Sequence, residues 1–231
     1  MKTASATARV SRTKPSVPDR APAAARPKPG KHSRQPDEVR ARILEAAITA
    51  FAREGYNGAR MRNIASDAGI SIQLLVHHVK SKEALWRMVM EHILGQYEQH
   101  HAKSKALPPT ASAGERLKQA IADLVEFTAG VPELHRIMVQ EGGQLTPRMI
   151  WLTENLTRKN FAEWCQLIEE AQRKGAVRPC SPALLRYAIV SMAAVPFVVS
   201  AEYQFLTGKD PHSRGEINKL IEMITGLIVT G

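Results

Sequence analysis

The polar residues best suited to chemistry gather between residues 60 and 82, and their types suit contact with a polyanion rather than catalysis. Arginine and lysine pair with phosphates, and glutamine can hydrogen-bond bidentately to an adenine edge. The candidates are Arg60, Arg62, Ser71, Gln73, Leu74, His77, His78 and Lys80. Taken alone, the adjacent histidines and lysines could equally form a solvated face. Within a DNA-binding unit they would instead contact the double helix.

The rest of the sequence contains no spacing typical of an active site or a metal centre. Cys165 and Cys180 have no CxxC spacing and no histidine close in sequence, so we expect reduced thiols. Three histidines, His92, His100 and His101, have no second ligand group such as a cysteine or paired carboxylates at suitable spacing, which favours ordinary surface histidines over a metal site. Neither a phosphate-binding GxxxxGK loop nor an HExxH motif occurs. We therefore expect no enzyme activity, no metal and no cofactor.

Two short predicted helices would hold the candidate residues. Apolar residues recur at helical spacing over residues 60–68, Gly69 permits the positive φ of a tight turn, and Ser71 is a suitable N-cap for a helix over 71–77. This pattern is typical of a helix-turn-helix, in which the first helix crosses the DNA backbone and the second enters the major groove. Arg60 and Arg62 would then meet phosphates. Three apolar residues would turn inward: Ile70, Leu75 and Val79.

The remaining chain also shows helical periodicity and no strand pattern, so we predict an all-α protein of about nine helices. Capping boxes at Ser112-x-x-Glu115 and Ser213-x-x-Glu216 mark two helix starts, and Pro196 is expected to kink one helix. The predicted helices cover residues 36–55, 60–68, 71–77, 81–96, 112–128, 132–142, 146–174, 181–206 and 213–228.

The formal net charge of +10 is concentrated near the N-terminus. Residues 1–36 carry +8, whereas residues 37–96 and 97–231 carry +1 each. The segment 1–34 is rich in Ala, Pro, Ser, Lys and Arg and nearly devoid of large apolar side chains, which predicts a disordered basic tail. Such a tail could add phosphate contacts, raise solubility or act as an organellar transit peptide. Two folded domains should follow it, over residues 35–96 and 97–231.

Residues 42–85 resemble the DNA-binding domain of the TetR family of bacterial repressors. The matching text is Arg42-Ile43-Leu44, Ala46-Ala47, Phe51, Gly55-Tyr56, Ile64-Ala65, Ala68-Gly69-Ile70-Ser71 and His78-Val79-Lys80-Ser81-Lys82-Glu83-Ala84-Leu85. Weaker matches follow at Pro132-Glu133-Leu134 and between Leu206 and Pro211. The resemblance implies an all-helical homodimer with a helix-turn-helix head and a linking fourth helix. It also implies a C-terminal domain that dimerises through the last two helices and usually holds an effector.

The same resemblance gives individual residues a role. Ile72, Gln73 and Leu74 fall at base-reading positions, His78 at a groove-facing position, and Lys82 at a phosphate-contacting position at the start of the fourth helix. One departure is Val76, which stands where the family usually has a tyrosine that contacts a phosphate. Valine cannot make that hydrogen bond. Arg60 could replace the lost contact electrostatically.

Large apolar side chains in the C-terminal domain could line a ligand cavity or simply form the core and the dimer interface. The cavity candidates are Phe127, Met138, Trp151, Phe161, Trp164, Met192 and Phe197. Polar neighbours could orient a ligand or be solvated: Glu141, Gln144, Arg148 and Asn155. The family usually has such a pocket, so we expect a small-molecule effector, whose identity the residues do not give.

These observations favour a dimeric repressor that a small-molecule effector releases from a palindromic operator. One alternative is a ligand-independent regulator or architectural DNA-binding protein, and another is an enzyme with an N-terminal targeting peptide. The longest run without charges or turn residues, 187–201, is interrupted by Pro196 and is shorter than the roughly 20 apolar residues of a membrane span. We expect no membrane partner and a location in the bacterial cytoplasm, at the nucleoid.

Overall fold

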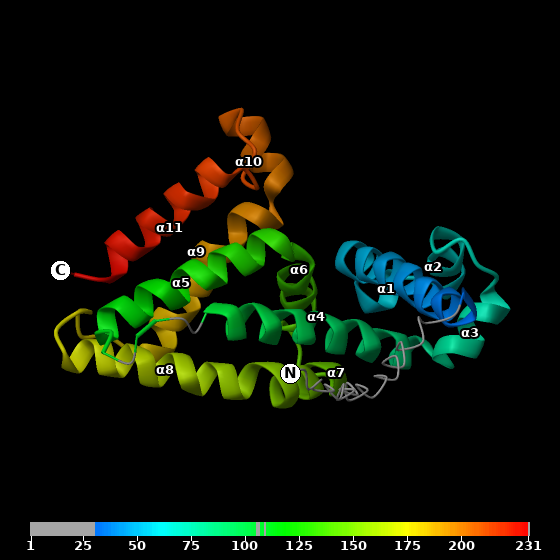
Figure 1. The fold of residues 1–231 in the computed structure, drawn as a ribbon, viewed down its shortest axis with the longest axis horizontal. Helices are drawn as coiled ribbons and strands as arrows, with labels where there is room; N and C mark the ends of the chain where they lie inside the picture. The colour runs from blue at the N-terminus through cyan, green and yellow to red at the C-terminus, as the bar shows by residue number, and fades with distance from the viewer. Residues whose placement is uncertain (1–30, 105–106, 109, 231) are drawn as a thin grey trace, which may run out of the picture.

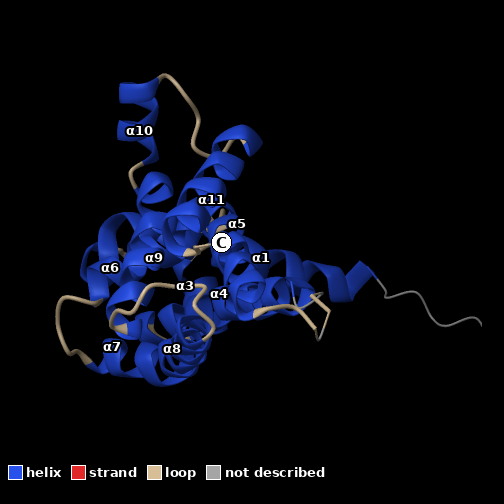
Figure 2. Ribbon diagram, turned by 90° about the vertical axis from the view of Figure 1, so that its left-hand side faces the viewer, coloured by secondary structure: helices blue, strands red, loops and turns tan. Residues whose placement is uncertain are grey.

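The computed structural model describes residues 31–104, 107–108 and 110–230. Every regular element within these ranges is helical and none is a strand, which confirms the predicted all-α fold (Figure 2). The elements are α1 (Lys31–Gly58), α2 (Met61–Asp67), α3 (Ile72–Val79), α4 (Lys82–Ser104), α5 (Ala113–Gly130), α6 (Pro132–Glu141), α7 (Pro147–Leu152), the π-helical turn η1 (Thr153–Thr157), α8 (Arg158–Arg173), α9 (Pro182–Val198), α10 (Ser200–Thr207) and α11 (Arg214–Ile228).

The first helix begins earlier than predicted. It starts at Lys31 rather than at Pro36, so the proline lies in the second turn of α1 and not at its first position. Four residues of the expected tail over 1–34 thus belong to α1, while residues 1–30 lie outside the described residues. Gly55 breaks the helix as predicted, since its φ of 68° is left-handed.

One of the two predicted capping boxes forms. Ser112 Oγ accepts from the Glu115 amide at 3.2 Å, and a Glu115 carboxylate oxygen accepts from the Ser112 amide at 2.7 Å. The box at Ser213 was predicted wrongly, because its glutamate has other partners. Glu216 accepts from the Tyr203 hydroxyl at 2.6 Å and from Lys219 at 2.8 Å, and Ser213 makes no side-chain cap.

Two predicted long helices are each divided, which gives more helical segments than expected. The helix predicted over 146–174 contains the π-helical turn η1 between α7 and α8. The helix predicted over 181–206 bends by 74° between α9 and α10. Pro196 lies in the last turn of α9, and its lack of an N–H group weakens the helix just before the bend.

Two groups of buried side chains hold the molecule together. The first joins α1–α4 to the C-terminal domain, because it contains Phe127, Leu134, Ile137 and Leu152 besides the residues of the head. The second lies wholly within the C-terminal domain, among α5, α8, α9 and α11. The head is therefore packed firmly on α6 and α7.

The shape of the molecule follows from this packing. Figure 1 shows α1–α3 at one end and α4 running from them into the C-terminal domain, where α8 lies along the opposite edge from α10 and α11. The boundary expected at residue 96 falls inside α4.

Of the described helices, none is by itself long and apolar enough to cross a membrane; α9 and α10 would suffice in length and composition only together, across their bend.

Candidate DNA-binding surface and ligand cavity

The helix-turn-helix forms at the predicted place. Gly69, with φ of 65°, allows the turn, in which its amide donates to the Ser66 carbonyl at 3.0 Å. Ser71 caps α3 by accepting from the Leu74 amide at 3.2 Å. Leu75 and Val79 are buried, so they fix the face of α3 that remains for a partner.

The predicted DNA-contacting residues are exposed on and beside α2 and α3, with two exceptions. The exposed residues are Arg60, Arg62, Ser71, Gln73, Leu74, His77, His78 and Lys80. Ile72 is half-buried and packs against the core of the head, which limits its reach toward a base. Lys82 is half-buried at the start of α4. Val76, the departure from the family pattern, is exposed on the same helix.

A chain of contacts holds Lys82 in place. Its ammonium donates to the Asn57 carbonyl at 3.3 Å and lies 4.8 Å from the centre of the Tyr56 ring. The Arg148 guanidinium of α7 lies 3.8 Å from the centre of that same ring. Arg148 in turn pairs with Glu141, the buried last residue of α6, at 3.1 Å. Burial and, less strongly, the charge of Arg148 lower the pKa of Lys82.

We expect Lys82→Ala to weaken binding to every DNA sequence by a similar factor, because an ammonium at this place would contact phosphate rather than a base. The plot of log affinity against log salt concentration should become shallower by about one. Fluorescence anisotropy at several salt concentrations measures both. Lys159→Ala, on an exposed lysine of α8, is the control and should change neither. An unchanged salt slope for Lys82→Ala would contradict the assignment.

Gln73→Ala should have the opposite pattern. Gln73 is exposed near the start of α3, where its amide can pair with one base. Its loss should relax the preference at one base position, at a cost of about 1–3 kcal/mol for the preferred base. Binding to DNA libraries randomised at single positions measures this. If affinity for all sequences fell equally, Gln73 would be a phosphate contact and not a base reader.

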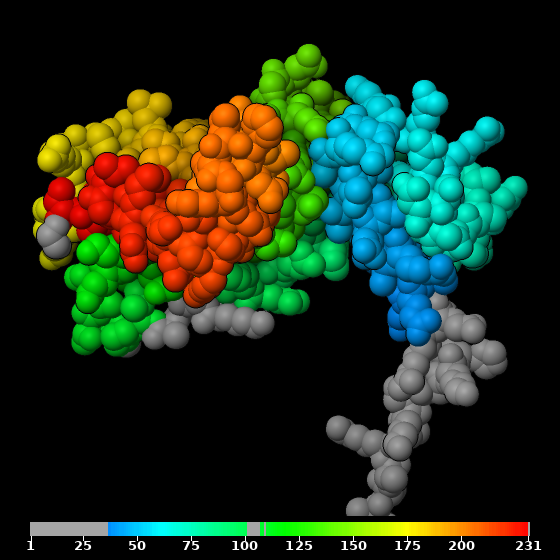
Figure 3. All heavy atoms as spheres, turned by 90° about the horizontal axis from the view of Figure 1, so that it is seen from above, coloured from blue at the N-terminus to red at the C-terminus, as the bar shows by residue number. Residues whose placement is uncertain are grey.

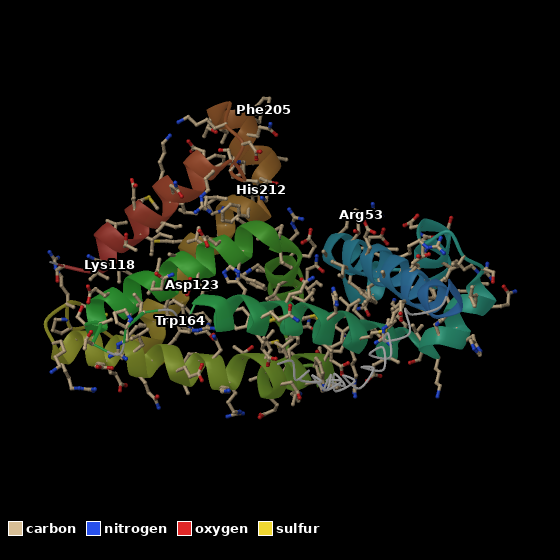
Figure 4. All side chains as sticks on the ribbon, in the orientation of Figure 1. Arg53, Lys118, Asp123, Trp164, Phe205 and His212 are labelled. Atoms are coloured by element: carbon tan, nitrogen blue, oxygen red, sulfur yellow. The ribbon has the colours of Figure 1, made fainter. Side chains whose placement is uncertain are left out.

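A cavity of about 340 Å³ lies among α4, α5, α6, α7, η1, α8 and α9. Three of the predicted cavity residues line it: Phe127, Met138 and Trp164. Figure 4 shows Trp164 between α8 and α5. The four other candidates do not line this cavity. Trp151 packs edge-on against Trp86, Phe161 lies against Tyr187, and Met192 and Phe197 belong to the core of the C-terminal domain.

The polar side of the cavity was not predicted. Tyr97, His135, Thr157, Asn160 and Arg186 line it. A signal for one of them exists in the sequence, because Arg186 is the single charged residue of α9. The other four give no such signal, since they come from four separate helical segments whose spacing in the chain is unrelated.

The four polar residues for which we left open a ligand contact or a solvated position do not line this cavity. Glu141 and Arg148 pair with each other where the C-terminal domain meets the head. Asn155 donates to the Trp151 carbonyl at 2.8 Å, and Gln144 is exposed. Among the described side chains, no three potential ligands gather to form a metal site. Cys165 and Cys180 are free thiols.

His135 makes the stability of the protein depend on pH. Burial and, secondarily, the charge of Arg186 lower its pKa from 6.5 to about 4. The imidazole is therefore neutral in the folded state at pH values where the unfolded chain binds a proton. Above about pH 6.5 His135 is neutral in both states and does not destabilise the fold. As the pH falls from about 6.5 to about 4, the free energy of unfolding should decrease by up to about 3 kcal/mol, because only the unfolded chain binds the proton.

Urea denaturation between pH 4 and 7.5 tests this pH dependence. The wild-type chain should lose more stability across this range than His135→Phe, which has no proton to bind. Parallel curves for the two proteins would refute the assignment of this loss to His135.

Two family profiles match the chain. The profile of bacterial regulatory proteins of the tetR family covers residues 43–89, which contain the helix-turn-helix. The profile of the tetracyclin repressor-like C-terminal domain covers residues 110–195, which contain most of the cavity wall. Together they span more than half of the chain.

Individual proteins agree with the profiles. The repressor SCO4008 of Streptomyces coelicolor is 29% identical over 178 residues, 76% of this chain and 87% of that protein. The repressor NicS of Pseudomonas putida is 30% identical over 114 residues, 49% of this chain and 53% of that protein. The structure of AibR in complex with isovaleryl coenzyme A and operator DNA shares the fold, with a TM-score of 0.66 at 18% identity over 83% of this chain and 97% of AibR. The chain therefore belongs to the TetR family and is a DNA-binding transcriptional regulator.

Proposed function

We propose that this regulator is a repressor that leaves a palindromic operator when a small molecule occupies the cavity. The observation that supports this is the double role of α6. Leu134, His135 and Met138 on this helix line the cavity. Gln140, two residues further on, donates to the Ala52 carbonyl of α1 at 2.9 Å. One short helix thus forms both the wall of the cavity and the support of the head.

The contacts of α6 explain how a ligand would reach the DNA. Ile137 of α6 is buried in the same core as the head residues, and Glu141 ends α6 in the pair with Arg148. A ligand that displaces α6 would therefore shift α1 together with Tyr56 and Lys82. A dimer contacts both half-sites only when its two α3 helices are about one DNA turn, or a multiple of it, apart. A ligand that favours another spacing weakens DNA binding by its difference in affinity for the two states.

We assign the dimer interface to α9–α11, which together correspond to the last two predicted helices, 181–206 and 213–228. Their surface carries large apolar side chains, among them Phe205, which is 88% exposed on the projecting α10 (Figure 4). Figure 3 shows α10 and α11, in orange and red, uncovered on the face seen there. Further exposed apolar side chains on α9–α11 are Leu184, Val195, Leu206, Met223 and Leu227. Exposed apolar side chains grouped in this way are unfavourable in water, and a two-fold contact between two copies of the chain would cover them.

The N-terminal segment and the cellular location complete the proposal. Residues 1–36 carry +8 of the net charge, which supports sequence-independent contacts with phosphates. A regulator that binds an operator in this way would be found in the bacterial cytoplasm, at the nucleoid.

Selection of bound sequences from a random DNA pool, with the full chain, tests the function. We expect a palindromic consensus whose half-sites are related by the two-fold axis of the dimer. Gln73→Ala in a parallel selection should relax one position in each half-site. No enrichment with the wild-type chain would overturn the proposal, and enrichment of a single unrepeated half-site would overturn its dimeric form.

A further inference from the structure

The cavity is apolar over most of its wall and polar on one side. Its apolar wall includes Leu124, Phe127, Met138, Met149, Leu156 and Trp164. Its volume of about 340 Å³ equals that of about eleven molecules of liquid water, so a ligand on the order of ten non-hydrogen atoms would fill it. These properties are typical of a site for a small organic molecule.

The polar side carries a buried positive charge that lacks a countercharge. Arg186 is only 8% exposed. Within the described residues its guanidinium makes one long hydrogen bond, of 3.4 Å from Nη2 to Asn160 Oδ1, and its Nε is buried without a hydrogen-bond partner. The guanidinium also lies 5.5 Å and 5.3 Å from the centres of the Phe161 and Tyr187 rings, which attract the cation but carry no negative charge. Across the described ranges, no carboxylate lies within ion-pair distance of this guanidinium. A buried cation without a countercharge is unfavourable, which favours a ligand that brings a negative charge.

Two further polar atoms of the cavity wall are buried without a hydrogen-bond partner. They are His135 Nδ1 on α6 and Thr157 Oγ1 in η1. A hydroxyl and an imidazole N–H can each donate to an oxygen. Together with Arg186 they form a set of unsatisfied groups on three different elements. Buried polar groups are normally satisfied, so such a set indicates a missing partner.

The number of charges and the geometry point to one class of anion. The imidazole of His135 is neutral near pH 7 because its pKa is lowered to about 4, so Arg186 supplies the one positive charge of this set. One charge balances a monoanion and not a doubly charged phosphate. The planar guanidinium also matches the two oxygens of a carboxylate.

We propose that the cavity binds a small monocarboxylate with an apolar body, with its carboxylate on Arg186 and its body against Phe127, Met138 and Trp164. One carboxylate oxygen would accept a hydrogen bond from the Thr157 hydroxyl or the His135 imidazole. This inference rests on the proposed function only in taking the cavity as the effector site. The preference for an acid over an amide or an alcohol follows from the buried guanidinium of Arg186 and does not depend on the proposed function.

Calorimetry on the full-length protein without DNA tests the ligand class. The probes are straight-chain acids from butanoate to octanoate, benzoate and phenylacetate, each compared with its own amide, together with hexyl phosphate. At least one acid should bind, and it should bind at least about tenfold more tightly than its amide, since hydrogen bonds to a charged partner are the stronger ones. Hexyl phosphate should bind more weakly than the acid of equal chain length. Equal affinity for acid and amide, or binding by none of the acids, overturns the inference.

Variants identify the residue responsible. Arg186→Gln should reduce the affinity for the acid to that for the amide and leave the affinity for the amide unchanged. Arg158→Gln is the matched control, because Arg158 is exposed beside the same π-helical turn and pairs with Glu154. It should change neither affinity. The comparison of acid and amide on the wild-type protein decides the question if Arg186→Gln does not fold.

A second measurement separates this inference from the proposed function. The acid that binds best is added to the complex of the protein with its selected DNA. An acid that binds the protein but does not release the DNA would contradict the repressor mechanism and leave the ligand class intact. Release by an amide as effective as its acid would contradict the ligand class and leave the mechanism intact.

Discussion

Trp86→Ala should lower the free energy of unfolding by about 3–5 kcal/mol, one of the largest effects of any single substitution in this protein. Trp86 of α4 is completely buried. Its ring packs edge-on against Tyr56 of the head at 6.4 Å and against Trp151 at 5.8 Å between centroids. Alanine would leave a cavity where the head meets the C-terminal domain. Both should therefore lose stability together, in one transition.

Trp86→Phe is the matched control for this experiment. It keeps an aromatic ring and removes the indole Nε1, which is buried without a hydrogen-bond partner. Trp86→Phe should lower the free energy of unfolding much less than Trp86→Ala. The removal of an unsatisfied buried polar atom is favourable and partly offsets the lost contact area. Urea denaturation followed by circular dichroism measures both. Two separate transitions in Trp86→Ala would show that the head unfolds independently, against the shared core.

Arg148→Met should have the second large effect and lower the free energy of unfolding by about 3 kcal/mol. The substitution leaves the carboxylate of Glu141, which is 7% exposed, without its cation, and it removes the guanidinium from the Tyr56 ring. The double variant Glu141→Gln/Arg148→Met should recover most of the loss, because neither residue is then charged. Glu141→Gln alone completes the double-mutant cycle, and the double variant compared with the sum of the two single variants gives the coupling energy.

Arg158→Met provides the comparison for an exposed pair. Arg158 and Glu154 form an ion pair at the surface of the C-terminal domain, with 67% and 51% of the side chains exposed. Solvent screens the attraction in such a pair, so Arg158→Met should change the free energy of unfolding by a barely measurable amount. A loss in Arg148→Met as small as that in Arg158→Met would mean that Glu141 is solvated and does not join the head to α7.

The helix-turn-helix could be predicted because its determinants are local. Gly69 and Ser71 set the turn, and Leu75 and Val79 set the inward face, all within one short stretch. The half-burial of Ile72 could not be predicted in this way, because its packing against the head core depends on residues far away in sequence. Which residues of the helix-turn-helix contact DNA stays a prediction.

The cavity could be predicted only in part because it is a product of tertiary packing. Phe127, Met138 and Trp164 belong to three helices, and apolar periodicity identifies such residues without saying whether they face a void or a neighbour. The contact between Tyr56 and Arg148 joins residues that are distant in the chain. No spacing rule encodes it.

The π-helical turn η1 lets the polar side of the cavity change without a change in the packing around it. A π-helical turn holds about one residue more than an α-helical turn, so deletion of Thr157 would convert η1 to α-helix and leave α8 nearly aligned with α7. Asn160 and Trp164 would then keep their places in the cavity wall. The cavity would lose one hydroxyl group and keep its guanidinium, so a single deletion would alter which polar groups of a ligand it can satisfy.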